Sequence, residues 1–286
     1  MDRRTGGYIL AMVIFGTLAP FVRRIAVSSG ELALYRAILG AALIGVYLLA
    51  SKKALPRGNR REYLLLLLSG GAMGINWILL FEAYRYTTVS TATLCYYFAP
   101  VMVTVLSPLL FREKLTPRQL LCFAMATLGL VLITGMERGG SVKGVLFGLG
   151  AACFYAAVVL LNKYIRDIDG IHRTFFQFLA AIVTLIPYVA LTGGVTLSRL
   201  NTTGWLCLLT VGLVHTGITY CLYFSSLKAL PGQRAAILSY IDPLTAVLVS
   251  VTVLREPITL PQALGGALIL GFTLWNLLPE RTKQPS

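Results

Sequence analysis

The chain has 286 residues, of which 57% are apolar and only 13% are charged, and its mean hydropathy is +0.77. A soluble domain carries about a quarter charged residues, so this composition excludes an ordinary soluble protein. The formal net charge of +14 would suit a nucleic-acid-binding protein. The basic residues, however, stand in short polar breaks between long apolar stretches, so we expect no nucleic-acid partner.

Ten apolar stretches follow one another along the chain, and each is long enough to form a membrane-spanning helix. They cover residues 7–26, 31–50, 63–84, 88–111, 117–136, 143–163, 173–192, 203–226, 233–254 and 259–278. The first stretch lacks a small-residue cleavage site, so we expect a first helix and not a removable signal peptide. The sequence therefore predicts an all-α membrane protein with ten transmembrane helices, surrounded by the lipid bilayer.

The basic residues also predict an orientation. With the N-terminus inside, the inner segments hold 16 Lys and Arg residues and the outer segments hold 7. Because cytoplasmic loops carry an excess of Lys and Arg, we expect both termini to face the cytoplasm. The location expected is a cell membrane, the inner or plasma membrane of a bacterium. The residues leave the oligomeric state open.

Signals of metal binding, cofactor binding and catalysis are missing from the chain. The five cysteines lie inside apolar stretches at neither metal-ligand nor disulfide spacing, namely Cys95, Cys122, Cys153, Cys207 and Cys221. The chain has two histidines, and it contains no H-E-x-x-H, no G-x-S-x-G and no G-x-x-x-x-G-K-[ST] motif. We therefore expect no cofactor, no metal, no ATP hydrolysis and no enzyme activity.

One segment is written twice. Residues 74–119 align with 217–262 at a constant offset of 143, and 12 of the 46 paired positions are identical. Such a repeat sets the architecture. With five helices in each half, the two halves enter the membrane in opposite orientation, so the repeat is inverted. The sequence predicts one five-helix repeat over 1–138 and a second over 139–286, which together form one membrane unit.

Some of the shared residues have structural explanations. Thr116 with Gln119, and Thr259 with Gln262, have the spacing of capping boxes at helix starts, and Ser28 with Glu31 has similar spacing. The Arg112-Glu113 and Arg255-Glu256 pairs are interpreted as interfacial pairs that end helices 4 and 9. The glycines at 70, 71, 74, 144, 148, 265 and 266 are expected to let helices approach closely.

Two prolines are expected to bend their helices. Pro100 and Pro243 each stand near the middle of an apolar stretch and lack the N–H that would bond to the carbonyl four residues before. The carbonyls of Tyr96 and Ser239 are then left free at membrane depth, where only a neighbouring helix or a wet cavity tolerates them. We expect a pair of kinks, either as the wall of a binding site or as simple packing bends.

These residues together resemble the drug/metabolite transporter superfamily, in particular its ten-helix EamA-type members. The resemblance rests on the doubled P…E-x-x-T-x-x-Q…G pattern, on Phe15-Gly16, on basic residues that close helices 1 and 6, and on Arg36. It covers the whole chain and implies a central cavity opened alternately to each side. Members carry amino acids, amines, nucleotide-sugars, sugars or drugs, mostly outward. The family's Trp before the glycine of helix 1 is Phe15 here, so no such contact is implied.

Polar residues that break the repeat are the main candidates for a site. Asp242 is near the centre of helix 9 and aligns with Ala99 in the other copy. Burying a carboxylate at membrane depth costs free energy, so a carboxylate at this position suggests a function. We interpret it as a site for a proton or a substrate amine, with a structural partnership as the alternative. Glu82 is the second candidate, although Arg85 stands close enough to pair with it. Arg36 could meet either carboxylate or an anionic group of a solute.

Further candidates have weaker signals. His215 titrates near neutral pH and could relay protons, or it could be a hydrogen-bonded packing residue. Aromatic rings beside a carboxylate can form a cage for an organic cation. The aromatic and amide candidates are Asn76, Trp77, Tyr96, Tyr97 and Tyr240.

The interpretation that best fits these patterns is a secondary transporter of a small organic metabolite, amine or amino-acid-like, which works by alternating access and exports its solute. Proton coupling through Asp242 is part of this hypothesis. The alternative is an uncoupled facilitator, or uniporter, of small organic solutes in the same fold.

Overall fold

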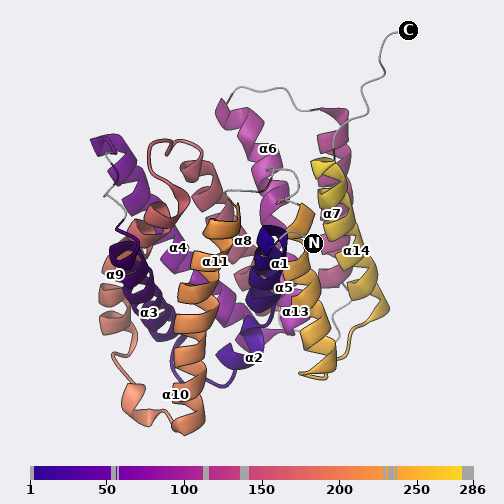
Figure 1. The fold of residues 1–286 in the computed structure, drawn as a ribbon. Coiled ribbons are helices and arrows are strands. Elements are labelled where there is room, and N and C mark those ends of the chain that lie inside the picture. The colour runs from indigo at the N-terminus through magenta and orange to yellow at the C-terminus, as the bar shows by residue number, and fades with distance from the viewer. Residues whose placement is uncertain are drawn as a thin grey trace.

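A computed structural model describes residues 3–52, 56, 58–111, 116–135, 142–227, 230, 235 and 237–278. Every regular element in these ranges is helical (Figure 1). The first part contains α1 (Arg3–Gly16), α2 (Leu18–Val22), α3 (Ser29–Ala50), α4 (Arg60–Tyr86), α5 (Val89–Tyr96), α6 (Ala99–Phe111) and α7 (Pro117–Gly135). The second part contains α8 (Val142–Asn162), α9 (Gly170–Thr192), η1 (Leu197–Arg199), α10 (Thr202–Leu209), η2 (Thr210–Ile218), α11 (Thr219–Leu227), α13 (Ile241–Thr252) and α14 (Leu260–Leu277).

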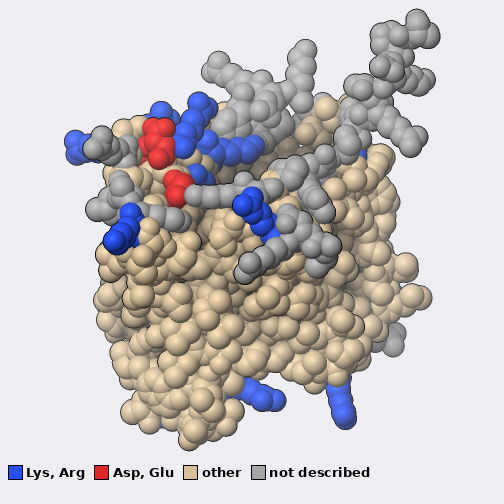
Figure 2. Space-filling view, in the orientation of Figure 1, with Lys and Arg blue, Asp and Glu red and all other residues tan. Residues whose placement is uncertain are grey.

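Within the described residues, seven helical segments are long and apolar enough to cross a membrane, judged by their length and composition. They are Arg4–Val22, Ser29–Ala50, Arg60–Tyr86, Val89–Leu106, Val142–Asn162, Gly170–Thr192 and Thr202–Leu227. Two shorter apolar helices cover Pro117–Ile133 and Ile241–Thr252. On the face drawn in Figure 2, Lys and Arg lie toward the two ends and a broad tan region separates them. This is a multi-span membrane protein. The full set of ten spans, their inverted arrangement and the division at residue 138 stay predictions.

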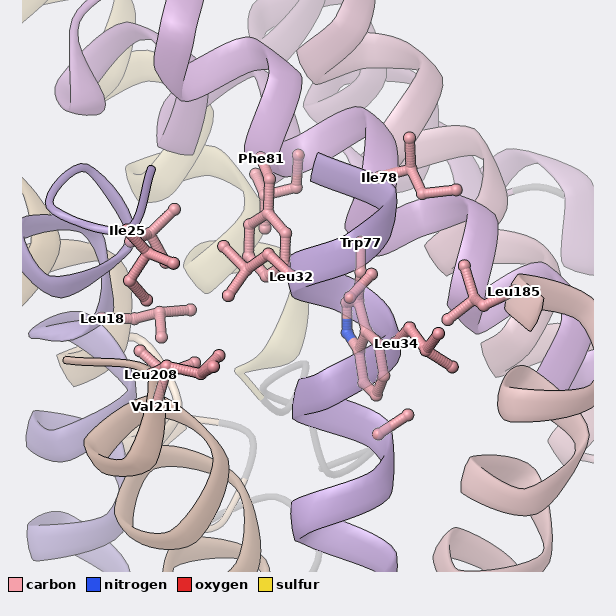
Figure 3. Close-up of a cluster of buried hydrophobic side chains, with 14 of the residues drawn as sticks. Leu18, Ile25, Leu32, Leu34, Trp77, Ile78, Phe81, Leu185, Leu208 and Val211 are labelled. Atoms are coloured by element: carbon pink, nitrogen blue, oxygen red, sulfur yellow. The ribbon is translucent and has the colours of Figure 1, made fainter. Parts of the chain in front are cut away.

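The helices pack in an interleaved way, because helices from the two halves of the sequence contact each other. α4 packs along α8 and α9, α3 along α9 and η2, and α1 along α11 and α13. The largest cluster of buried apolar residues joins α2, α3 and α4 to α9, α10 and η2, and Figure 3 shows part of it, with Leu18, Leu34, Trp77 and Leu208. This cluster holds the two halves together on one side of the molecule.

Close helix contacts depend on glycine where a side chain would not fit. A Cβ added to Gly70 of α4 would stand 2.4 Å from the carbonyl oxygen of Gln177 in α9. A Cβ added to Gly265 of α14 would stand 2.4 Å from the carbonyl oxygen of Gly129 in α7. Backbones that approach this closely gain van der Waals contact, which is the main attraction between helices in lipid. The packing role predicted for Gly70 and Gly265 is confirmed.

The predicted helix caps are also present. Thr259 accepts from the N–H of Gln262, whose side chain bonds back to the N–H of Thr259, and Thr116 and Gln119 make the same pair of bonds. Ser28 accepts from the N–H of Glu31, but the Glu31 carboxylate instead accepts from the N–H and the hydroxyl of Thr196. Glu31 therefore ties the start of α3 to the loop before η1.

The chain is interrupted just before both prolines. α5 ends at Tyr96 and α6 begins at Ala99, while in the other half a turn at Ser239 and Tyr240 precedes α13. A third interruption separates α1 from α2 at Thr17, whose hydroxyl donates to the carbonyl of Ile14. At Pro100 and Pro243 the helix is therefore interrupted by a short turn, across which backbone hydrogen bonds continue, as from Tyr97 to Thr93 and from Asp242 to Ser239. Arg112 and Glu113 lie outside the described residues.

Candidate functional site

A cavity with a volume of about 500 Å³ lies between the two halves of the chain. Its size falls within the range of sites that bind small organic molecules. Helices α1, α3, α4, α5, α8, α9, α11 and α13 contribute to its wall. Much of this wall is aromatic, with Phe15, Trp77, Tyr84, Tyr96, Tyr97, Tyr155, Tyr220, Tyr223 and Phe224. Such a wall can hold a flat or apolar group against ring faces and offers hydroxyls for orientation.

Asp242 lies on the cavity wall in the first turn of α13. Its carboxylate accepts a hydrogen bond of 2.6 Å from the hydroxyl of Tyr97, which belongs to the break between α5 and α6. Within the part of the chain that the structure describes, no Lys, Arg or His nitrogen lies within ion-pair distance of Asp242. The carboxylate is therefore held by a neutral donor and faces a cavity that can admit a cation, water or a proton.

Arg36 of α3 lies on the same cavity wall and is only 4% exposed. Its Nε donates to the hydroxyl of Thr216 at 2.9 Å. Its guanidinium carbon lies 4.6 Å from the ring centroid of Trp77, at cation–π distance. The described part of the cavity wall thus presents the carboxylate of Asp242 and two guanidinium groups, the buried one of Arg36 and that of Arg173 in α9.

Six of the residues predicted from sequence therefore meet at one cavity, namely Arg36, Trp77, Tyr96, Tyr97, Pro100 and Asp242. The other five do not line it. Of these, Glu82 pairs with Arg85 at 3.2 Å along the outside of α4, and the amide nitrogen of Asn76 donates to the carbonyl of Ala151 at 2.6 Å. Tyr240 and Pro243 are buried beside the break that precedes α13.

His215 lies in a stretch of unusual helix. η2 is a π-helix of nine residues, Thr210–Ile218. π-Helical turns are rare in proteins overall, but those that occur are often found at functional sites. The side chains of His215 and Thr216 in η2 and of Thr219 at the start of α11 bond to carbonyls five residues before, as Thr216 does to Val211 at 2.8 Å. The other ring nitrogen of His215 lies 3.1 Å from the hydroxyl of Thr17. His215 thus joins η2 to the break between α1 and α2.

Sequence reasoning missed several of the cavity's rings, among them Tyr84, Tyr155, Tyr220 and Tyr223. A usable signal exists for two of them. Tyr220 and Tyr223 stand three residues apart in α11, so they share a helix face. No other tyrosine stands three or four residues from Tyr84 in α4 or from Tyr155 in α8.

The two ends of the cavity differ. The lining residues extend to Asn162, Gly170 and Leu227, where α8 ends, α9 begins and α11 ends. Toward the opposite end they stop at residues such as Ala19 and Tyr84, so the cavity does not reach the ion pair between Arg23 and Glu256.

A polar network closes that opposite end. Glu256, which follows the end of α13 together with Arg255, pairs with Arg23. The Glu256 carboxylate also accepts from the N–H of Val89 at 2.8 Å and from the hydroxyl of Ser250. Arg23 donates in addition to the carbonyl of Thr87 at 2.9 Å. These bonds join the segment after α2, the start of α5 and the end of α13.

Comparison with known proteins identifies relatives along most of the chain. The profile of the EamA-like transporter family matches residues 7–135 and 142–278. An uncharacterized transporter of Bacillus subtilis, YxxF, is 30% identical over 281 residues, which cover 96% of this chain and 89% of the relative. An uncharacterized transporter of Archaeoglobus fulgidus is 30% identical over 270 residues, with 93% of each chain covered.

More distant similarities extend to human and solved proteins. Human solute carrier family 35 member G1 is 23% identical over 202 residues, which cover 65% of this chain and 54% of the relative. One solved crystal structure superposes over 99% of each chain with a TM-score of 0.69 at 22% identity, which shows likeness of fold alone. Because the family profile spans both parts of the sequence, the chain belongs to the EamA-like transporter family, within the drug/metabolite transporter superfamily.

Proposed function

We propose that this chain is a secondary transporter that moves a small organic metabolite, amine or amino-acid-like, through the cavity by alternating access, and that Asp242 is its coupling site. The observation that carries the proposal is the Asp242 carboxylate on a largely aromatic cavity wall, bonded to Tyr97. A carboxylate at membrane depth is stable when it is protonated, hydrated or paired with a cation. Exchange among these three states is what coupling of solute to proton requires.

Alternating access has support in the difference between the cavity's two ends. The cavity extends to the end where α8 and α11 finish, and the network around Glu256 lies across the other end. We propose that this conformation admits solute from the first end, and that breaking the Arg23–Glu256 network opens the second. A ligand shifts such an equilibrium only by its difference in affinity for the two conformations.

We further propose ten spans in two inverted repeats of five helices, with both termini in the cytoplasm. The excess of Lys and Arg in the segments assigned to the inner side supports the orientation. Under this orientation, the end that the cavity reaches faces the cytoplasm, because Lys163 and Arg166 follow α8. Solute would load from the cytoplasm, which supports export.

The test uses proteoliposomes loaded with candidate amines and amino acids, in which solute flux is measured with and without a pH gradient. We expect the gradient to drive concentrative transport in the wild type. In Asp242→Asn, concentrative transport should be abolished while exchange of labelled for unlabelled solute continues. Equal flux with and without the gradient would favour the uncoupled facilitator.

A second carboxylate variant makes the assignment of Asp242 specific. Glu82 pairs with Arg85 outside the cavity wall, so Glu82→Gln should keep the dependence on the gradient. If Glu82→Gln lost coupling to the pH gradient while Asp242→Asn kept it, the proton site would be assigned to Glu82 and not to Asp242.

A further inference from the structure

The guanidinium of Arg36 has donors that the protein does not use. Of the five N–H donors of an arginine, the one on Nε binds the hydroxyl of Thr216. The two terminal nitrogens have no hydrogen-bond acceptor among the described residues, and they are not among the buried polar atoms sealed without a partner. Because Arg36 lines the cavity, these nitrogens are left facing its interior.

Among the described residues no carboxylate lies within ion-pair distance of Arg36, although Asp242 on the same cavity wall acts on it electrostatically. The ion pairs found in the described ranges join Arg23 to Glu256, Arg85 to Glu82 and His172 to Asp169. Arg36 belongs to none of them, although it is only 4% exposed. Burying a charge without an opposite charge is costly unless a cation–π contact, water or a bound anion offsets it. The Trp77 ring supplies the first of these on one face of the guanidinium.

The repeat provides a contrast within the same chain, because Arg36 aligns with Arg173 near the start of α9. The terminal nitrogens of Arg173 donate to the carbonyls of Asn162, Ile165 and Ile168, at 3.4, 2.9 and 3.1 Å. Arg173 therefore holds the segment between α8 and α9 in place. Arg36, the equivalent arginine of the first half, donates to no carbonyl in the part of the chain that the structure describes.

We infer that Arg36 is the binding site for a carboxylate group on the transported solute. Nε is fixed by Thr216 and the guanidinium face by Trp77, so the remaining edge presents the two parallel donors that match a carboxylate. A group with a single negative charge suits this site better than a phosphate ester, which carries nearly two charges and would share the cavity with the Asp242 carboxylate. This inference rests on the proposed transport of a solute through the cavity.

Trp77 provides the reporter, since it touches Arg36 and the chain has only three tryptophans. Replacing Trp205 and Trp275 with Phe leaves Trp77 as the one indole in the purified protein. The probes are phenylacetate, its neutral analogue phenylacetamide, phenethylamine and phenyl phosphate, chosen because the cavity wall is aromatic. Each probe is titrated to tens of millimolar while the emission of Trp77 is recorded.

We expect phenylacetate to change the Trp77 emission with a dissociation constant on the order of 1 mM, and to bind at least about tenfold more tightly than phenylacetamide. Arg36→Lys should weaken phenylacetate by about tenfold or more, because lysine keeps the charge but lacks the planar fork. The matched control is Arg85→Lys, which lies outside the cavity wall and should keep phenylacetate affinity within about threefold. Thr216→Val is a second variant, which removes the hydroxyl that fixes Nε of Arg36 and keeps the positive charge of Arg36. It should weaken the binding of phenylacetate several-fold.

Several results would overturn the inference. One such result is no change in Trp77 emission across the phenylacetate titration. Others are equal affinities for phenylacetate and phenylacetamide, a higher affinity for phenyl phosphate than for phenylacetate, or an unchanged affinity for phenylacetate in both Arg36→Lys and Thr216→Val. The proposed function is judged separately, by flux in proteoliposomes. If phenethylamine alone binds and flux still depends on the pH gradient, the carboxylate site is wrong and the transporter proposal stands. If carboxylates bind at Arg36 but no solute moves, the transporter proposal fails instead.

Discussion

Replacing Glu256 with Gln should open the end of the cavity that the Arg23–Glu256 network closes. The carboxylate accepts from the Arg23 guanidinium, the N–H of Val89 and the hydroxyl of Ser250. Glutamine has nearly the same shape, but it removes the negative charge and offers one acceptor oxygen in place of two. The change therefore weakens the contacts that join α2, α5 and α13 without leaving a hole.

The size of the effect follows from the exposure of the pair. Hydrogen bonds to charged groups contribute about 1.5–3 kcal/mol each, whereas exposed ion pairs contribute about 0–1 kcal/mol. The side chains of Arg23 and Glu256 are 31% and 11% exposed, which places this pair between the two cases, at about 2 kcal/mol in total. Because 1.4 kcal/mol is a factor of ten, the population open at this end should rise about 30-fold.

The assay measures access to a cysteine introduced at Ala19, a buried cavity-wall residue of α2, after the five native cysteines are replaced by serine. A membrane-impermeant thiol reagent is applied to right-side-out and to inside-out vesicles. Glu256→Gln should raise the labelling rate about 30-fold from one side of the membrane only. Arg85→Gln, which breaks the exposed pair with Glu82 on α4, is the control. An unchanged rate in Glu256→Gln, or an equal rise in the control, would refute the reasoning.

Three further predictions concern stability and proton transfer. Gly16→Ala puts a Cβ 2.5 Å from the carbonyl oxygen of Asp242, so it should destabilise the protein by about 1–3 kcal/mol; a melting temperature equal to the wild type would contradict this. Thr259→Ala removes the cap of α14 and should cost about 1 kcal/mol, seen as a melting temperature lower by roughly 2–4 °C; an unchanged value would mean that the cap is dispensable. His215→Gln should slow transport yet keep the midpoint of its pH profile, because both ring nitrogens already have partners in Thr17 and Thr210; a shifted midpoint would make His215 a proton carrier.

Local chemistry allowed much of the fold to be predicted from the sequence. The caps at Thr116 and Thr259 formed because their partners stand three residues away, at a distance fixed by the helix itself. The breaks before Pro100 and Pro243 follow from a missing N–H, which no tertiary contact can restore. Apolar length alone indicated most of the helices.

Features that depend on distant residues could not be read from the chain. Glu256 pairs with Arg23, which stands 233 positions away, whereas its neighbour Arg255 was the nearest candidate in sequence. The π-helical stretch of η2 also has no local signature in the sequence, and its Thr216 contacts Arg36 of α3, which stands 180 positions away. The same limit applies to the cavity, where Asp242 meets a tyrosine from the other half of the chain.

The hydrogen bond between Tyr97 and Asp242 joins two interruptions of regular helix, one in each half of the chain. Tyr97 stands in the gap between α5 and α6, and Asp242 follows the turn that precedes α13. At each of these interruptions a helix can change direction without losing further backbone hydrogen bonds. One hydrogen bond therefore links both interruptions. Under the proposed coupling at Asp242, a proton or cation that reaches this carboxylate would weaken that one bond and so affect both halves together.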